Sequence, residues 1–372
     1  MIATAPIPGR VATPIERVAV AAYTVPTDAP ESDGTLEWHS TTMVVVEVEA
    51  GGERGLGYTY SNVATARLVE STLAAVVEGI DAMDVQAAWE AMVAAIRNLG
   101  RPGISSAAIA AVDVALWDLK ARLLELPLAT LLGSVHESIP VYGSGGFTSY
   151  DISHLQAQLA AWVERGIPRV KMKVGRKPRD DPARVSAARE AIGGEGDLYV
   201  DANGAYERKQ ALELAEAFAE NGVAWFEEPV SSDDLEGLRL LRDRAPSGMA
   251  IAAGEYGYDL PYFRRMLEAE AVDVLQADVT RCAGITELLR VAALCRAHSI
   301  HLSAHTAPSI HAHACCAIEP LAHVEYFHDH VRIEELLLEG VVTPVDGRLR
   351  PDRSRPGLGL ELKRADAERY AA

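Results

Sequence analysis

The stretch RVKMKVG, residues 169–175, places two lysines two positions apart in a run that otherwise reads as buried. In a β-strand, residues i and i+2 project from the same face, so Lys171 and Lys173 are predicted to point the same way. Two adjacent ammonium groups repel each other, and their burial is costly unless an anionic group lies beside them. The stretch therefore predicts a strand that ends at a charged site.

Short apolar segments of this kind recur along the second part of the chain. Eight of them begin at intervals of 22 to 30 residues, at 139–146, 169–175, 197–204, 224–230, 250–255, 273–279, 300–306 and 322–327. Between most of them lie stretches with helical spacing and cap signals, such as DISHLQAQLAAWVERG at 151–166. This alternation predicts an α/β fold with a closed TIM-like barrel of βα units. A doubly wound parallel sheet is the alternative that the pattern leaves open.

The residues on either side of the barrel follow other patterns. Runs such as RVAVAAYTV (17–25) and TTMVVVEVEA (41–50) predict an antiparallel meander, followed by helices around 64–98 and 105–125. Residues 344–370 are rich in Pro, Gly and Arg, so an ordered extension is expected there. The predicted division is an N-terminal α+β domain (1–135), a barrel domain (136–335) and a C-terminal segment (336–372).

The charge of the chain limits its partners. With 35 Lys and Arg against 53 Asp and Glu, the formal net charge is −18. Nucleic acid and anionic membrane surfaces require a basic face, so neither is expected as a partner. A small anionic substrate is still allowed, because local cations decide whether it binds.

Cysteine usage and the N-terminus bear on the cellular compartment. The chain has four cysteines without a CxxC motif, which favours a reduced, cytoplasmic protein with incidental thiols. The first residues, MIATAPIPGR, lack the basic and apolar regions of a secretory signal, so none is expected. The longest stretch without Asp, Glu, Lys or Arg, 297–318, contains five histidines and a proline, which is incompatible with a membrane span.

Polar side chains stand at the C-terminal ends of seven successive predicted barrel strands, where the active sites of such barrels lie. A purely structural barrel has no reason for this placement. In strand order they are Lys171 and Lys173, Asp201 and Asn203, Glu227 and Glu228, Glu255, Asp278, His305, and Glu325.

Three of these carboxylates, Asp201, Glu227 and Glu255, follow neighbouring strands and are expected to converge at the barrel mouth. Each alone could be a solvated loop acid or a helix N-cap. Converging carboxylates repel unless protons or a cation neutralise them, and hard oxygen ligands suit Mg²⁺. Their joint placement therefore predicts a Mg²⁺ site. Glu228 alternates to the other face and is left out of it.

Asp278 and His305 follow neighbouring strands and are expected to pair. A carboxylate bonded to one imidazole nitrogen fixes the tautomer, raises the basicity of the ring and leaves the other nitrogen to move protons. A zinc site is disfavoured, because His311 and His313 would diverge by about 200° on a helix and the carboxylates prefer a harder ion.

These motifs resemble the enolase superfamily and, within it, the mandelate racemase subgroup, over nearly the whole chain. The resemblance rests on AAVDVALWDLKARLLELPLATLLG (110–133), the K-x-K of 171–173, VDANGAY, WFEEP, AAGE, Asp278, His305 and the Glu of VEYF. One departure is Ala283 in RCAGIT, where the family often has paired glycines. The resemblance therefore does not predict the conformation of the turn there.

The resemblance implies a (β/α)7β barrel, an N-terminal capping domain, a C-terminal segment that returns to the cap, and a homo-oligomer. It implies that Asp201, Glu227 and Glu255 hold Mg²⁺, and that Lys173 and the His305–Asp278 pair transfer protons on opposite faces of a small carboxylate substrate. Lys171 would contact the substrate carboxylate and lower the pKa of Lys173, a protonated Glu325 would bond a carboxylate oxygen, and Asn203 would bond a substrate hydroxyl.

This arrangement suits abstraction of the proton α to a carboxylate, because a divalent cation and nearby donors stabilise the enediolate as charge develops. The pairing of Lys or His bases with Mg²⁺ is a known feature of the superfamily. Return of the proton to the opposite face gives racemisation of a 2-hydroxy acid. Loss of a β-hydroxyl gives dehydration of a sugar acid, an aldonate or aldarate, to a 2-keto-3-deoxy acid. The resemblance favours the dehydratase.

Substrate selectivity is expected from capping loops at 33–40 and 57–64. Their polar and aromatic residues suit a polyhydroxylated substrate, although ordinary solvated loops are an equal alternative; the candidates are Trp38, Tyr58 and Tyr60, with Glu37, His39, Ser61 and Asn62 beside them. His328 and His330, just past the last strand, either line the pocket or face solvent.

Three other functions are disfavoured. A muconate-cycloisomerase or dipeptide-epimerase type would carry a lysine in place of Asp278 and would not need His305. A catalytically inactive barrel is disfavoured because every catalytic position is filled. A phosphate-binding barrel would want Gly-rich turns after strands 7 and 8, and TAPSIHAHA and FHDHVRIEE contain none.

Overall fold

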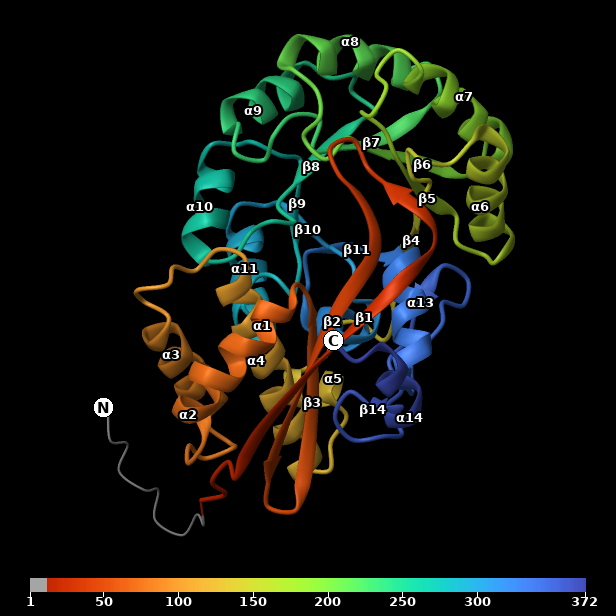
Figure 1. The fold of residues 1–372 in the computed structure, drawn as a ribbon. Coiled ribbons are helices and arrows are strands. Elements are labelled where there is room, and N and C mark those ends of the chain that lie inside the picture. The colour runs from red at the N-terminus through yellow and green to blue at the C-terminus, as the bar shows by residue number, and fades with distance from the viewer. Residues whose placement is uncertain (1–11) are drawn as a thin grey trace.

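The computed structural model describes residues 12–372, so the prediction that no secretory signal occupies residues 1–10 lies outside the described residues. A ring of helices surrounds a barrel, and a second region with its own sheet and helices lies beside it (Figure 1). Among the described residues, no helix is long and apolar enough to cross a membrane. All four cysteines are buried with free thiols.

The barrel consists of eight parallel strands that pair in chain order. Because the last strand, β11, also pairs with the first, β4, the sheet closes on itself. The predicted closed barrel is therefore confirmed, and the doubly wound sheet is excluded. The strands are β4 (Ile139–Gly145), β5 (Arg169–Lys173), β6 (Asp197–Asp201), β7 (Val223–Glu227), β8 (Ala250–Ala253), β9 (Val274–Ala277), β10 (His301–Ala304) and β11 (Leu321–Phe327).

Helices cover the outside of the barrel. In the first of them, Asp151 caps the N-terminus by accepting a hydrogen bond of 2.8 Å from the backbone N–H of His154, and Leu155, Leu159 and Trp162 form the buried face at helical spacing. The covering helices are α6 (Ile152–Glu164), α7 (Asp181–Ile192), α8 (Arg208–Ala219), α9 (Leu235–Arg244), α10 (Leu260–Glu268), α11 (Ile285–Ala297), α12 (Pro308–Ala314) and α13 (His328–Leu337).

The N-terminal region packs an antiparallel sheet against helices. Its strands are β1 (Arg17–Ser32), β2 (Glu37–Ala50) and β3 (Glu53–Tyr60), and its helices are α1 (Val63–Leu68), η1 (Val69–Leu73), α2 (Ala74–Val77), α3 (Val85–Ala95), α4 (Ile104–Leu123) and α5 (Leu128–Leu132). The glycines of β3 allow close packing on α4. A Cβ at Gly57 would lie 2.2 Å from the carbonyl oxygen of Ala111, so only glycine fits there.

The β1–β2 hairpin extends from the N-terminal sheet across the barrel (Figure 1). Its turn lies against the C-terminal ends of β5 and β6. A Cβ at Gly34 would come within 2.4 Å of the carbonyl oxygen of Ala202 and 2.8 Å of that of Val174. Nearby, the backbone N–H of Thr148 donates to the carbonyl oxygen of Ser32 at 2.8 Å. The hairpin therefore covers the barrel end at which the polar residues were predicted.

The C-terminal residues contact both parts of the molecule. β13 (Arg348–Leu349) pairs with β4, while β12 (Leu338–Glu339) pairs with β14 (Glu361–Leu362), and α14 (Arg364–Ala367) follows. The backbone N–H of Ala372 donates to the carbonyl oxygen of Ala22 in β1 at 3.0 Å.

The turn that contains Ala283 is formed without the second glycine of the family pattern. Ala283 adopts a left-handed conformation with φ 65°, which is sterically unfavourable for a residue with a Cβ. The following Gly284 has φ 96°, and a Cβ there would lie 2.3 Å from a carboxylate oxygen of Asp113. The turn therefore tolerates alanine at the first position and requires glycine at the second.

Candidate active site

The parallel register of the barrel brings the predicted metal ligands together. Asp201 ends β6 and is the register partner of Glu227, which ends β7, while Glu255 follows β8. Each residue offers one oxygen, and these oxygens lie within 4.8 Å of one another. All three side chains are buried. Three carboxylates from adjacent strands thus face one small volume.

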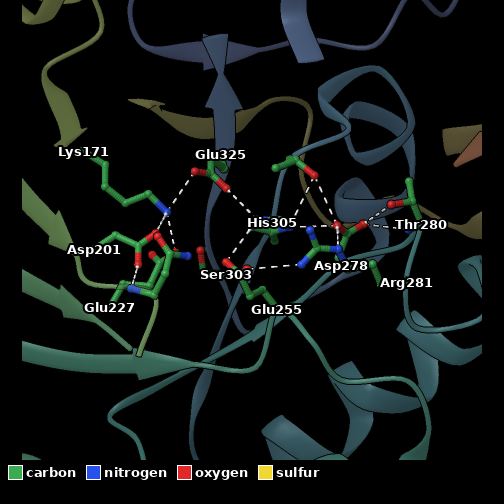
Figure 2. Close-up of polar contacts among 12 residues, drawn as sticks. Lys171, Asp201, Glu227, Glu255, Asp278, Thr280, Arg281, Ser303, His305 and Glu325 are labelled. Carbon is green, nitrogen blue, oxygen red and sulfur yellow. Dashed lines mark hydrogen bonds and ion pairs between the residues drawn. The ribbon is translucent and has the colours of Figure 1, made fainter. Parts of the chain in front are cut away.

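Lys171 lies between carboxylates from three strands (Figure 2). Its Nζ contacts Glu227, lies 2.9 Å from Glu325 Oε1 and lies 3.3 Å from Asp201 Oδ2. Burial works to lower the pKa of Lys171, but Glu227 and Glu325 outweigh it and raise that pKa well above its usual value. The ammonium group is therefore held charged, with carboxylates as the anionic neighbours that two buried lysines require.

Lys173 projects from the same face and contacts the first of the three carboxylates. Its Nζ lies 2.5 Å from Asp201 Oδ2. Burial lowers the pKa of Lys173, Asp201 raises it, and Lys171 lowers it, with a net shift upward from the usual value. Lys171 thus acts in the expected direction, but Asp201 outweighs it in this arrangement.

His305 and Asp278 form the expected pair. His305 Nδ1 lies 2.8 Å from Asp278 Oδ2, and the other carboxylate oxygen accepts hydrogen bonds of 2.7 Å from the N–H and the hydroxyl of Thr280. This leaves Nε2 on the site side, 3.1 Å from Glu255 Oε2 and 3.5 Å from Glu325 Oε2 (Figure 2). Burial lowers the pKa of His305, but Glu255 and Glu325 outweigh it and raise the value to about 10.

Glu325 lies between the two cationic groups, Lys171 and His305. Burial raises the pKa of Glu325, but these cations outweigh it and lower the value to about 2. Lys171 and His305 therefore favour the ionised form of Glu325, whereas the protonated form expected beside a substrate carboxylate stays a prediction. The physical reason is that Lys171 and His305 both stabilise the charged carboxylate.

The carboxylate triad fits a hard divalent cation, because each member is oriented by a donor from the chain. Trp225 Nε1 donates to Glu227 Oε2 at 2.9 Å, the Asn203 N–H donates to Asp201 Oδ1 at 2.9 Å, and Arg281 Nη1 donates to Glu255 Oε1 at 3.2 Å. Such supporting contacts are typical of metal sites.

The charge of Glu227 also points to a cation. Burial and the neighbouring Asp201 raise the pKa of Glu227 to about 8, against the opposing effect of Lys171. A buried carboxylate beside another carboxylate takes up a proton or a cation. Oxygen ligands of this kind suit Mg²⁺.

Two of the supporting residues were absent from the sequence prediction. Trp225 stands two positions before Glu227 in the same strand, and residues i and i+2 share a face, so strand periodicity could have identified it. Arg281 lies in the turn after β9, and no periodicity in the sequence links it to Glu255.

The predicted capping residues make contacts within the chain. Trp38 Nε1 donates to Glu31 Oε2 at 2.8 Å, and its ring packs edge-on against Phe147. The Tyr58 hydroxyl donates to Glu334 Oε1 at 2.5 Å, which ties β3 to α13. A substrate contact by Tyr58 would have to replace that bond.

Tyr60 and Asn203 make weaker polar contacts within the chain than Tyr58 does. The Tyr60 hydroxyl donates to the carbonyl oxygen of His330 at 3.3 Å, and its ring stacks on the His330 ring. The side-chain oxygen of Asn203 is buried and has no hydrogen-bond partner among the described residues. That unpaired oxygen is compatible with the predicted bond to a substrate hydroxyl.

The histidines that suggested zinc are bonded to the backbone. His311 Nδ1 lies 2.7 Å from the carbonyl oxygen of Thr306, and its Nε2 accepts a bond of 3.2 Å from the N–H of Val279. His313 Nδ1 accepts a bond of 3.4 Å from the N–H of Ala129. Both rings are therefore part of the packing around α12.

Two family models together match most of the chain. Residues 17–133 match the N-terminal domain of mandelate racemase / muconate lactonizing enzyme, and residues 154–367 match the model described as enolase C-terminal domain-like. The chain belongs to the mandelate racemase / muconate lactonizing enzyme family of the enolase superfamily, which confirms the predicted resemblance and the prediction of an enzyme.

Solved and curated relatives cover nearly the full length. A mandelate racemase/muconate lactonizing enzyme-like protein from Rubrobacter xylanophilus is 63% identical, with a TM-score of 0.95, over 96% of this chain and 100% of that one. The 3,6-anhydro-alpha-L-galactonate cycloisomerase of Streptomyces coelicolor is 32% identical over 94% of this chain and 98% of its own length.

A third relative was solved with ligands. The L-talarate/galactarate dehydratase of Salmonella typhimurium, with Mg and L-lyxarohydroxamate, is 28% identical, with a TM-score of 0.90, over 99% of this chain and 95% of that one. Its bound Mg agrees with the carboxylate triad described above.

Proposed function

We propose that this protein is a Mg²⁺-dependent hydro-lyase that removes water from a sugar acid to give a 2-keto-3-deoxy acid. The proposal rests above all on the position of the two proton-transfer groups. Lys173 comes from β5, and the His305–Asp278 pair comes from β10 and the end of β9, so they flank the carboxylates of β6, β7 and β8 from both sides. A substrate carboxylate near that triad would have one group on each side of its α-carbon.

Mg²⁺ held by Asp201, Glu227 and Glu255 supplies positive charge beside the substrate carboxylate. Lys171 adds a second positive charge, because its ammonium is buried and fixed by Glu227 and Glu325. Charge develops on the carboxylate oxygens as the α-proton leaves, and preorganised cations in a buried site stabilise that charge.

The proton is transferred at Lys173 Nζ or His305 Nε2. Asp278 holds His305 Nδ1 at 2.8 Å, so Nε2 faces the site in a fixed orientation. The group that takes the α-proton must be neutral. Against the effect of burial, Asp201 and Glu255 raise the pKa values of Lys173 and His305, and sharing their charge with a bound Mg²⁺ would lower both values. The other group, in its protonated form, donates a proton to the departing β-hydroxyl, and water leaves. The configuration of the substrate decides which group takes which part.

A racemase or epimerase of a 2-hydroxy acid is the alternative, since the same two groups can remove and return the α-proton on opposite faces. The dehydratase is favoured by the relatives, among which the Salmonella typhimurium enzyme is named a dehydratase of sugar diacids. Asp278 stands where a muconate-cycloisomerase type would carry a lysine, and such an enzyme would not need His305.

A panel of sugar acids with MgCl₂ tests the proposal. We expect a semicarbazide-reactive 2-keto product from at least one acid, and loss of that product when EDTA removes the metal. The same reactions in D₂O report exchange of the α-hydrogen. Exchange or inversion without any 2-keto product would replace the dehydratase with the racemase.

We further propose that the protein is a homo-oligomer and is cytoplasmic. A homo-oligomer is expected from family habit, and light scattering after size-exclusion chromatography measures it. A cytoplasmic location is expected from the free thiols, and cell fractionation measures it.

A further inference from the structure

His330, the third residue of α13, lies beside the site and has no part in the proposed chemistry. Its ring stacks on Tyr60 at a centroid distance of 3.4 Å and meets Phe327 edge-on at 5.2 Å. The side chain is only 7% exposed, yet Nδ1 has no hydrogen-bond partner among the described residues. Burial of a polar atom without a hydrogen-bond partner costs free energy, so we expect a bound ligand to supply that partner.

The contact with Phe327, which ends β11 two residues after Glu325, places this ring beside the proposed site. Burial is the main cause that lowers the pKa of His330 to about 3, and the charged groups that act on it are Asp278, His305, Arg281 and Glu325. The imidazole is therefore neutral at physiological pH. A neutral imidazole can accept or donate one hydrogen bond, which suits a hydroxyl group, but it cannot neutralise a carboxylate.

Two arginines near His330 are already paired with carboxylates. Arg281 lies 3.2 Å from Glu255 Oε1 and 3.6 Å from Asp278 Oδ2. Arg332 lies 2.5 Å from Asp329 Oδ1, and its Nη2 also donates to the carbonyl oxygen of Pro26.

Next to Trp38 stands Glu31, a fully buried acidic side chain whose pKa burial and Asp329 raise to about 8. A second carboxylate on the substrate near His330 would therefore meet a neutral ring and paired arginines, with no free cation among these groups. Burial of a charge without a counter-charge is strongly unfavourable.

We propose that the substrate tail is an uncharged hydroxylated chain, as in an aldonate, and that His330 hydrogen-bonds one of its hydroxyl groups. This inference rests on the proposed function and narrows its substrate class. The relatives do not decide it, because one is named for a galactonate derivative with a single carboxylate and another for the diacids talarate and galactarate.

Matched acids test the charge of the tail. D-Gluconate and D-glucarate share one configuration and differ in the distal group, and so do D-galactonate and galactarate. In at least one such pair we expect kcat/KM for the aldonate to be at least roughly tenfold above that for the aldarate. A factor of this size is the usual cost of burying one polar group without a partner.

Variants of His330 test its contact. In His330→Phe the aromatic ring can still stack on Tyr60, but the nitrogen is lost. We expect kcat/KM for the preferred aldonate to fall roughly tenfold to a hundredfold, mainly through KM. Mg²⁺ affinity, measured by calorimetry, stays unchanged because the carboxylate triad is intact. His330→Asn, with an amide near the position of Nδ1, retains more activity than His330→Phe.

His328 provides the matched control. It lies two residues earlier on α13, and its Nε2 is already paired with Asp28 at 3.0 Å. We expect His328→Phe to change kcat/KM less than roughly twofold, because a surface substitution away from the site has a small effect.

The outcomes separate the inference from the proposed function. Turnover of aldarates in preference to aldonates, or an unchanged KM in both His330 variants, overturns the inference and leaves the dehydratase standing. Absence of both turnover and α-hydrogen exchange with every sugar acid overturns the proposed function and the inference with it.

Discussion

Within residues 12–372, two groups of side chains each bring three potential metal ligands close together. The inner cluster is Asp201, Glu227 and Glu255, and the outer cluster is Asp28, Glu31 and His328; in each, three potential ligand atoms lie within 4.8 Å of one another. The inner residues come from three adjacent barrel strands and are all buried. In the outer cluster the Asp28 side chain is 45% exposed.

The two clusters also differ in how their charge is compensated. In the inner cluster Lys173 contacts Asp201 and Lys171 contacts Glu227, so ammonium groups share the carboxylate charge. In the outer cluster burial and Asp329 raise the pKa of Glu31 to about 8, which favours its protonated form. Proximity alone does not make a metal site. The inner cluster combines convergent strands with donors that orient each carboxylate.

The largest expected effect separates the clusters directly. We expect Glu255→Gln to abolish turnover and to reduce Mg²⁺ affinity more than roughly hundredfold. Loss of a residue that only supports a metal ligand costs up to about that factor, and loss of a ligand should cost more. Calorimetry of the wild-type protein should show one Mg²⁺ per chain. Asp28→Asn is the matched control in the outer cluster and should leave both values unchanged. The reverse pattern would move the metal to the outer cluster.

The next effect concerns the two proton-transfer groups beside the inner cluster. We expect Lys173→Ala and His305→Asn each to lower dehydration by roughly a hundredfold to ten-thousandfold, the usual contribution of a general acid or base. Proton NMR in D₂O should show that one variant loses α-hydrogen exchange while the other retains it. Retention of exchange in both variants would exclude these residues as the base.

A smaller effect is expected from the hydrogen bond that orients Glu227. Trp225→Phe removes the Nε1 donor and should weaken Mg²⁺ binding roughly tenfold, as loss of an outer-sphere partner does. The control is Trp162→Phe, because Trp162 Nε1 has no partner among the described residues. Equal Mg²⁺ affinities in the two variants would show that this bond does not support the site.

The smallest effect tests the protonation of the outer cluster. The pKa of Glu31 is raised by burial and by Asp329, so its stabilising contribution is complete below about pH 4.5 and is lost as pH rises through about 8. Urea titrations at pH 5 and pH 9 should show that the free energy of unfolding falls by at least about 1 kcal/mol more in wild type than in Glu31→Gln, since a rise of even one pKa unit corresponds to about 1.4 kcal/mol. Glu37→Gln, at an exposed pair with Arg176, serves as control. Identical pH dependence in wild type and Glu31→Gln would show that Glu31 is ionised in the folded protein.

Sequence by itself determined the barrel, the strand ends and the chemical types that meet there. Every predicted barrel segment overlaps an observed strand, because the spacing of βα units and the apolar runs are local properties of the chain. The convergence of Asp201, Glu227 and Glu255 also followed, since parallel strands in register end at the same edge.

Only the tertiary structure decided how these groups are bonded. The ionised state of Glu325 depends on Lys171 and His305, and the bond from Tyr58 to Glu334 joins residues 276 positions apart. Protonation states and side-chain partners depend on burial and on groups distant along the chain, and no periodicity in the sequence records either one.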